Sequence, residues 1–254
     1  MVTDFISNAL LVGSSLAIAF LIGATSIGGM LLGPALNMIG EVPIHMAIPS
    51  CMFAFIFAGG IGAIFFSRGG AKLREDLVEL MVSAGVGAFA GSLTLAYLPA
   101  VVIQLIVATV CIASGIRFML VRTKHLGSSP SIRPSKRILF IIGIVTGFGS
   151  ALTGTGGPMI LMPCLMALRV DIKRAVGLAH LIQIPIGILA TAGNLLLGRM
   201  DFNVALPLTA TVVVGAGVGA IFAQRVSTRV LGQSVAVLLV VSGVAYALKT
   251  IGLL

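Results

Sequence analysis

Six long apolar runs constrain this chain more than any other feature of its 254 residues. Each is about 20 residues long, which as a helix is enough to cross the roughly 30 Å hydrocarbon core of a bilayer. They occupy residues 46–66, 77–97, 100–121, 175–197, 203–223 and 230–252. We therefore expect an all-α polytopic membrane protein, because only helices and closed barrels satisfy every backbone hydrogen bond within lipid.

The composition agrees with a lipid environment and excludes several classes of protein. Only 9% of the residues are charged, whereas a soluble domain carries about 25%. All seven acidic residues lie near the ends of apolar runs or between them, which argues against a membrane enzyme or proton relay that needs a buried carboxylate. The net charge of +9 is spread over loops, which indicates topology rather than nucleic-acid binding. No Lys or Arg precedes Arg68, so we expect no signal peptide.

The cysteines and histidines predict no metal or cofactor site. Cys51, Cys111 and Cys164 lie in apolar sequence, and their spacing fits neither a disulfide framework nor a metal site. We interpret them as small buried hydrophobic residues. Because no cluster of His and Cys has metal-ligand spacing, we expect no metal, no cofactor and no catalytic site.

Two further apolar regions, residues 2–40 and 138–168, are each interrupted by a glycine motif. The motifs are "TSIGGM", which begins at Thr25, and "TGTGGP", which begins at Thr153. Non-helical backbone is costly in a membrane unless it is buried in protein or lines a cavity. In the second region the arms, 138–152 and 159–168, reach only about 22 and 15 Å as helices. Neither arm comfortably spans at these lengths, so we predict a re-entrant or broken hairpin in each region and leave open whether the arms span fully.

The two motifs are part of a repeat with an offset of 128 residues. Seven glycines in the first half coincide with a glycine in the second, against about two expected by chance from 32 glycines in 254 residues. Matches between apolar residues are common in such a chain, so we count only the matches between glycines. The match predicts two repeats, residues 1–125 and 138–254, joined by a basic linker at 126–137.

Loop charges predict that the repeats are inverted. In the first half, basic residues fill the segments at 68–74 and 117–137, and the turns near Glu41 and Pro99 carry none. In the second half, the counterparts of these two bare turns are the basic ones. Because basic loops stay in the cytoplasm, equivalent loops of the two halves should face opposite sides. We thus predict two inverted repeats, each a glycine-motif hairpin plus three transmembrane helices.

The breaks have the chemistry of an anion site. The second arm of each hairpin begins at the break, so free N–H groups and the positive end of a helix dipole point inward. Glycine lets an oxyanion approach the backbone, and nearby hydroxyls add donors. The substrate-binding candidates at the breaks are Thr25, Ser26, Gly28, Gly29, Thr153, Gly154, Thr155, Gly156 and Gly157. Close helix packing is the alternative role of glycine, which we prefer for Gly87, Gly91, Gly215 and Gly219.

Longer stretches around the motifs resemble a known family. "TGTGGPMILMP" and "TSIGGMLLGP", the turns "RAVGLAH" and "HMAIPSC" after them, and the later "GRMDF" and "GAGVGA" are similar to the TauE/SafE family of sulfite and organosulfonate exporters. The resemblance covers nearly the whole chain. The first motif departs from the pattern at Ser26, Met30 and Pro34. The resemblance implies a bacterial inner-membrane carrier of sulfur-containing or related organic anions.

Five residues outside the breaks are further substrate-binding candidates, namely Ser50, Cys51, Arg117, His180 and Gln183. His180 could bind an anion or carry a coupled proton, or it could form a hydrogen bond with a neighbouring helix. Arg117 could bind substrate, or extend along its helix to the cytoplasmic face. Ser50 and Cys51 are the first-half counterparts of residues close to His180 and could line the site.

These observations predict a secondary transporter. It would move a small anion, a sulfonate or sulfite-like oxyanion, across the bacterial inner membrane by alternating access. Its partners would be this anion and the lipid bilayer, with H⁺ as a candidate coupling ion and no nucleic acid; a homodimer is left open. The alternatives are a passive anion channel and a carrier of another small carboxylate or oxyanion.

Overall fold

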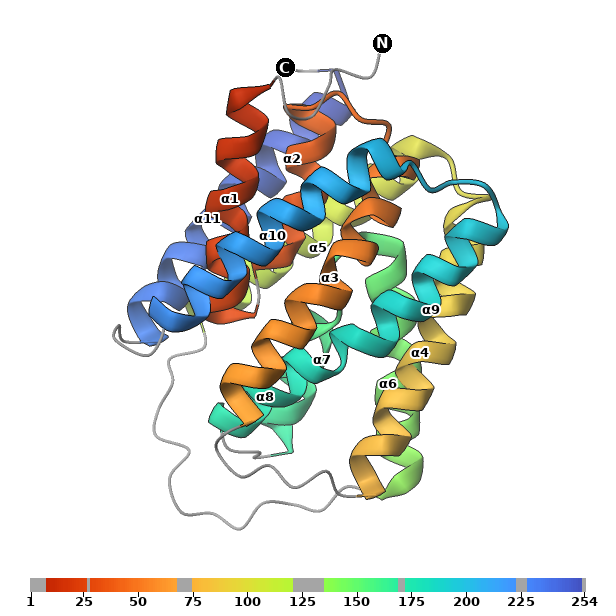
Figure 1. The fold of residues 1–254 in the computed structure, drawn as a ribbon, viewed down its shortest axis with the longest axis vertical. Coiled ribbons are helices and arrows are strands. Elements are labelled where there is room, and N and C mark those ends of the chain that lie inside the picture. The colour runs from red at the N-terminus through yellow and green to blue at the C-terminus, as the bar shows by residue number, and fades with distance from the viewer. Residues whose placement is uncertain are drawn as a thin grey trace.

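A computed structural model describes residues 8–26, 28–67, 75–120, 135–168, 172–222 and 228–252. Every regular element in these residues is a helix (Figure 1), which confirms the predicted all-α class. The elements are α1 (Ala9–Thr25), the short 3₁₀ helix η1 (Gly28–Leu31), α2 (Leu32–Met38), α3 (Ile44–Ser67), α4 (Glu75–Leu95), α5 (Ala100–Leu120), α6 (Lys136–Thr153), α7 (Pro158–Ala167), α8 (Ile172–Leu181), α9 (Gln183–Leu196), α10 (Phe202–Phe222) and α11 (Thr228–Thr250). Most of the predicted linker, 126–134, lies outside the described residues.

The described residues contain six helical stretches that are long and apolar enough to cross a membrane. The stretches are Ile44–Ile64, Val78–Leu95, Ala100–Arg117, Lys136–Thr153, Gly177–Leu196 and Phe202–Phe222. Two shorter apolar helices, Ala9–Thr25 and Val235–Thr250, accompany them. Many large apolar side chains on the outer faces are exposed, such as Ile141, Val145 and Val241. An outer surface of this kind fits lipid, and the chain is a multi-pass membrane protein.

The first arm of the second hairpin is longer than the sequence suggested. The side chain of Ser135 caps α6 by accepting from the N–H of Ile138 at 3.4 Å, so the helix begins at Lys136. Its 18 residues reach about 27 Å. This arm is therefore long and apolar enough to cross a membrane. The second arm, α7, has ten residues, or about 15 Å, and remains short.

The expected run at 175–197 is also divided into two helices, α8 and α9, at Ile182. Pro185 lies three residues after the division. A proline inside a helix lacks an N–H donor and its ring crowds the carbonyl of the residue four positions earlier. The chain continues in nearly the same direction, because the N–H of Ile182 still bonds to the carbonyl of Leu178 at 3.0 Å. The effect is an interrupted helix whose central residues lie beside the glycine breaks.

Small residues let the helices approach closely. Helix α4 packs beside α6, and α10 beside α1. Gly87 and Gly91 on α4 face the backbone of α6, and Gly215 and Gly219 on α10 face the backbone of α1. A methyl group on any of the four would crowd atoms of the neighbouring helix. The packing role predicted for these four glycines is therefore confirmed.

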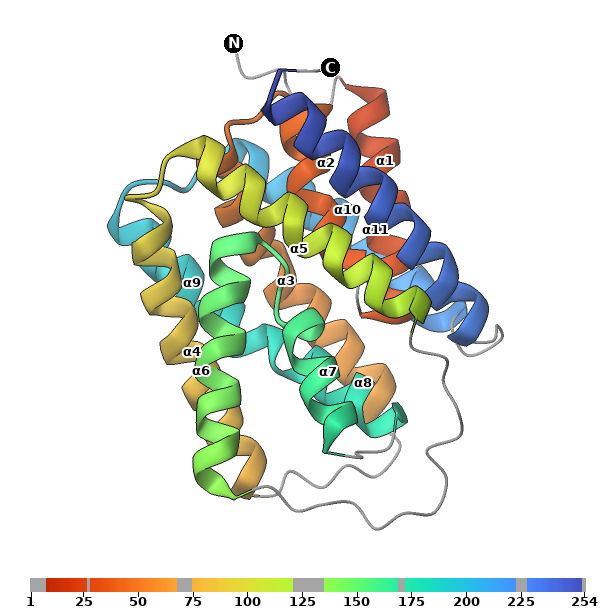
Figure 2. The ribbon, with the colours of Figure 1, turned by 180° about the vertical axis from the view of Figure 1, so that it is seen from behind.

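Helices α5 and α11 lie side by side in opposite directions (Figure 2). A methyl group on Gly115 would lie 2.7 Å from the carbonyl oxygen of Ala236, and one on Gly243 would lie 3.1 Å from that of Ala108. The later part of each helix thus meets the earlier part of the other, as antiparallel packing requires. The second contact follows from the first when 128 is added to the number of the glycine and subtracted from the number of the alanine.

Both described ends of the chain lie on one side of the molecule (Figures 1 and 2). The helix ends that border the basic segments lie along the other side, and they are the ends of α3, α5, α7 and α10 and the starts of α4, α6, α8 and α11. Among these basic residues Lys136 and Arg137 are described and exposed. The side chains of the loop cations from 68 to 74 lie outside the described residues.

Candidate functional site

The second break is a short non-helical segment between α6 and α7. Helix α6 ends at Thr153, and Gly154 caps it in the left-handed conformation, with φ 70°. The N–H groups of Gly154 and Thr155 both bond to the carbonyl of Ser150, at 2.9 and 3.3 Å. Pro158 then starts α7, at a position where its missing N–H costs nothing. The sequence predicted this break at the correct residues.

Two glycines in this segment have backbone angles that other residues rarely adopt. Gly156 has φ +73° and Gly157 has φ +108°. Side chains would also clash there, since a methyl group on Gly156 would lie 2.9 Å from the ring of Phe55. One on Gly157 would lie 2.8 Å from Ile186 of α9. Only glycine therefore fits at these positions.

The second break also leaves backbone donors unused. Among the described residues, the N–H groups of Gly156, Gly157 and Met159 donate to no acceptor. Met159 is in the first turn of α7, where a helix has no carbonyl of its own to offer. Successive free N–H groups in a glycine turn are a common way to hold an anion.

The first break has a different local structure. Helix α1 ends at Thr25, and Ser26 caps it with φ 66°, so a serine holds the left-handed position that Gly154 holds in the second break. The N–H of Ser26 bonds to the carbonyl of Ile22 at 2.7 Å. The next described residue, Gly28, begins the 3₁₀ helix η1. The two breaks therefore share the cap and differ in the backbone structure after the cap.

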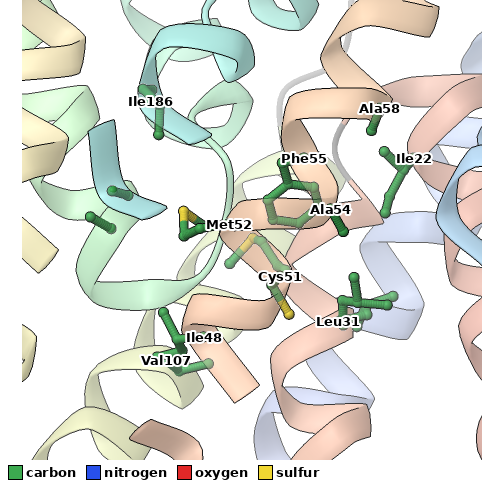
Figure 3. Close-up of a cluster of buried hydrophobic side chains, with 14 of the residues drawn as sticks. Ile22, Leu31, Ile48, Cys51, Met52, Ala54, Phe55, Ala58, Val107 and Ile186 are labelled. Atoms are coloured by element: carbon green, nitrogen blue, oxygen red, sulfur yellow. The ribbon is translucent and has the colours of Figure 1, made fainter. Parts of the chain in front are cut away.

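The two breaks meet at Phe55 of α3. A methyl group on Gly29 would lie 2.8 Å from the Phe55 ring and 3.4 Å from the carbonyl oxygen of Thr155. Gly156 approaches the same ring from the other break. Figure 3 shows the Phe55 side chain between Ile22 of α1 and Ile186 of α9. The structure thus brings together glycine motifs that are 128 residues apart in sequence.

A polar contact also joins the two halves. Nε2 of Gln183, the first residue of α9, donates to Oγ of Ser26 at 3.4 Å. Gln183 is 1% exposed and Ser26 is 2% exposed, and Oε1 of Gln183 has no partner. The pair is therefore a buried amide and hydroxyl beside the first break, with one polar atom left unused.

The threonines and Ser50 use their hydroxyls mainly within their own helices. Oγ1 of Thr25 donates to the carbonyl of Leu21 and Oγ of Ser50 donates to that of Met46, at 2.7 and 2.8 Å. Thr153 lies within hydrogen-bond distance of the carbonyl of Gly149 at 2.7 Å and of Oγ1 of Thr155 at 3.2 Å. In this arrangement Thr153 and Thr155 form a pair of hydroxyl groups next to the second break.

The remaining candidates lie at different distances from the breaks. His180 is fully buried in the last turn of α8 and its ring packs against Gly62 of α3. Cys51 is a buried member of the hydrophobic core, as Figure 3 shows. Arg117 is exposed in the last turn of α5, where its charge acts on Cys164 of α7.

The centre of the described structure carries no charged side chain. Its buried polar residues are Ser, Thr, His, Gln and Asn, and none of them is Asp, Glu, Lys or Arg. The described residues also contain no group of three His, Cys, Asp or Glu side chains that could hold a metal ion. Cys51 and Cys111 are buried free thiols. Any polar recognition at this centre therefore depends on neutral N–H and O–H donors.

The sequence did not single out Phe55, which touches both breaks, or Ser150, whose carbonyl accepts two hydrogen bonds from the second break. Phe55 is one apolar residue among many in its run, so only the long-range contact identifies it. Ser150 carried a weak signal, as a polar residue one turn before a glycine motif in an apolar helix.

Helices interrupted by glycine motifs that meet inside a polytopic bundle are typical of membrane transporters. The comparison with known families gives the particular group. The chain belongs to the sulfite exporter TauE/SafE family, whose model matches residues 11–246. It is therefore a membrane transporter and not an enzyme, as predicted from the sequence.

Curated relatives are distant. "Probable membrane transporter protein YdhB" of Bacillus subtilis (strain 168) is 24% identical over 206 residues, which are 79% of this chain and 83% of the relative. "Probable membrane transporter protein MJ0441" of the archaeon Methanocaldococcus jannaschii is 24% identical over 162 residues, which are 60% of this chain and 58% of the relative. No solved structure matches the chain.

Proposed function

We propose that this protein is a secondary transporter that moves a small oxyanion, sulfite-like or a sulfonate, across the bacterial inner membrane by alternating access. The observation that carries the proposal is the meeting of two glycine breaks at Phe55, inside protein and away from solvent. Ser26, Thr155 and Gln183 are each at most 3% exposed. A carrier needs a closed state of this kind between its two open states.

The breaks would supply the anion's partners. In the second break, three neighbouring N–H groups lie at the start of α7, where the helix dipole favours negative charge. Thr153 and Thr155 add hydroxyls beside them, and Ser26 and Gln183 add polar groups from the first break. The family description supports a sulfur oxyanion as the cargo.

Alternating access would arise from two inverted repeats, 1–125 and 138–254. Support comes from helix contacts that recur when both residue numbers are shifted by 128. A methyl group on Gly59 of α3 would lie 2.8 Å from the carbonyl oxygen of His180. One on Gly187 of α9 would lie 2.8 Å from the carbonyl oxygen of Met52. Such contacts are expected of two halves related by an axis in the membrane plane.

Counterflow of anion in liposomes tests the proposal. Purified protein is reconstituted in vesicles loaded with unlabelled methanesulfonate, and uptake of the labelled anion is followed. A carrier gives transient accumulation of label above the outside concentration, because outward movement of the unlabelled anion drives inward movement of the label. Uptake that only ever relaxes to equality would instead identify a passive channel. Competition by acetate tests the alternative of a carboxylate carrier, and an imposed pH gradient tests H⁺ as the coupling ion.

A further inference from the structure

We infer that the hydroxyls of Thr146 and Ser150 on α6 complete the oxyanion site of the second break and make it selective for three-oxygen head groups. This inference rests on the proposed function and adds two residues that the glycine motifs do not include. It also makes the second break the main binding site and assigns the first break a supporting role.

The first observation concerns how these hydroxyls are used. Helical Ser and Thr hydroxyls elsewhere in the described chain commonly donate to a carbonyl of the preceding turn, as those of Ser50, Thr109 and Thr209 do. Thr146 and Ser150 are both 0% exposed, and neither Oγ atom has a hydrogen-bond partner. An unpaired buried hydroxyl is costly, so two of them one turn apart need an explanation.

The second observation is their position beside the break. The methyl carbon of Thr146 lies 3.7 Å from the position that a Cβ atom on Gly157 would occupy. The carbonyl of Ser150 accepts from the N–H groups of Gly154 and Thr155. Residues four apart share a helix face, so Thr146 and Ser150 lie on one face of α6, and the side chain of Thr146 packs against the non-helical segment.

The third observation is that this part of the structure holds unused donors of two kinds. The break contributes the N–H groups of Gly156, Gly157 and Met159, and α6 contributes two O–H groups. Five neutral donors match an anion whose charge is spread over three oxygens, each able to accept more than one hydrogen bond. A carboxylate has two oxygens and would leave part of this donor set unused. A sulfonate or sulfite head is therefore the better match.

The counterpart positions explain why only one break has this site. The residues 128 positions earlier are Ile18 and Ile22, and Ile22 is a buried member of the hydrophobic core. The first break therefore lacks the two hydroxyls. Its left-handed cap residue, Ser26, instead contacts Gln183.

Binding measurements on the purified full-length protein test the inference. The probes are methanesulfonate and acetate, and the variants are Thr146→Val and Ser150→Ala, singly and together. We expect each single change to weaken methanesulfonate binding about tenfold, which is about 1.4 kcal/mol, and to weaken acetate binding less. Thr146→Ser keeps the hydroxyl and should bind within about threefold of the wild type. The matched control is Thr191→Val, because Thr191 also has a buried unpaired hydroxyl but lies on α9, eight residues after Gln183.

Thermal stability separates loss of binding from loss of folding. Removing an unpaired buried hydroxyl without changing the shape should leave the anion-free Tm of Thr146→Val unchanged or higher. The rise in Tm on adding methanesulfonate should disappear in the double variant. Wild-type affinity in the double variant would overturn the inference, since the hydroxyls would then hold only a fixed water. A wild-type protein that binds neither probe would overturn the proposed function as well.

Discussion

Ser26 shows what a single residue does at this site. It adopts φ 66°, a left-handed conformation that glycine holds at the counterpart Gly154. A side chain in this region costs about 1–2 kcal/mol, so a serine is expected there only if its hydroxyl is useful. The contact of Ser26 Oγ with Gln183 is the visible use, and substrate binding is the proposed one.

Replacement of Ser26 distinguishes strain from binding. Ser26→Gly relieves the backbone and loses one hydrogen bond, so we expect the free energy of unfolding to change by no more than about 1 kcal/mol. Ser26→Ala keeps the strain and should lower it by about 1 kcal/mol, or about 2–4 °C in Tm. Both variants should bind methanesulfonate about tenfold more weakly than the wild type. Wild-type binding by Ser26→Gly would limit the residue to a structural role.

At this scale the sequence identified the break residues but not their common neighbour. Glycine and proline punctuate an apolar run visibly, so the motifs at Thr25 and Thr153 could be located from the sequence. The contact of Phe55 with Gly29 and Gly156 could not, because it joins three distant segments. Arg117 was a reasonable candidate by charge, yet the structure leaves it exposed at a helix end.

At the scale of elements, α2 is held in place by a partly buried polar cluster. Oδ1 of Asn37 accepts from Nε2 of Gln104 on α5 at 3.1 Å and from the hydroxyl of Tyr246 on α11 at 3.0 Å. Its Nδ2 donates to the carbonyl of Val42 at 2.8 Å. The position 128 residues later is Leu165 on α7, which cannot form these bonds. The cluster therefore ties the first hairpin, and not the second, to α5 and α11.

Removal of Asn37 tests this anchor. Asn37→Leu leaves the partly buried amide of Gln104 and the hydroxyl of the buried Tyr246 without their acceptor, so we expect a loss of about 1–2 kcal/mol of stability. A double-mutant cycle with Tyr246→Phe measures the coupling. The double variant should be less destabilised than the two single losses together, by about 1 kcal/mol, because the second change removes an already unpaired hydroxyl. Additive losses in Tm would show that the two side chains act independently.

Helix positions could be predicted from apolar length, but helix interruptions could not. The predicted run at 203–223 is α10 (Phe202–Phe222) almost residue for residue. Prolines give no consistent signal, since Pro49 and Pro207 lie inside helices without ending them. Pro185, in contrast, lies in the first turn of α9, just after the division at Ile182. Apolar length therefore located most of the long helices, whereas the division at Ile182 left no comparable signal in the sequence.

At the scale of the whole molecule, loop charge and helix packing support one arrangement. The helix ends that border the basic segments lie on the side away from the chain ends (Figures 1 and 2). If that side is cytoplasmic, as the positive-inside rule requires, the two glycine hairpins enter from opposite faces. The inverted orientation stays a prediction that depends on which face each turn reaches.

Cysteine labelling in intact cells measures those faces. Tyr97 in the turn after α4 is 81% exposed, and Arg137 at the start of α6 is exposed on the other side. In a variant without Cys51, Cys111 and Cys164, we expect Tyr97→Cys to react with a membrane-impermeant thiol reagent from outside, because the turn before α5 carries no basic residue. Arg137→Cys should react only after the membrane is permeabilised. Asn203 is exposed at the start of α10, and we expect Asn203→Cys to react from outside, as Tyr97→Cys does. Its counterpart in the first half borders the basic segment at 68–74, so inverted repeats place the two positions on opposite faces. Inverted repeats require an odd number of membrane crossings between residues 137 and 203, so these two residues must face opposite sides. Labelling of Arg137→Cys and Asn203→Cys from the same face would therefore contradict inverted repeats.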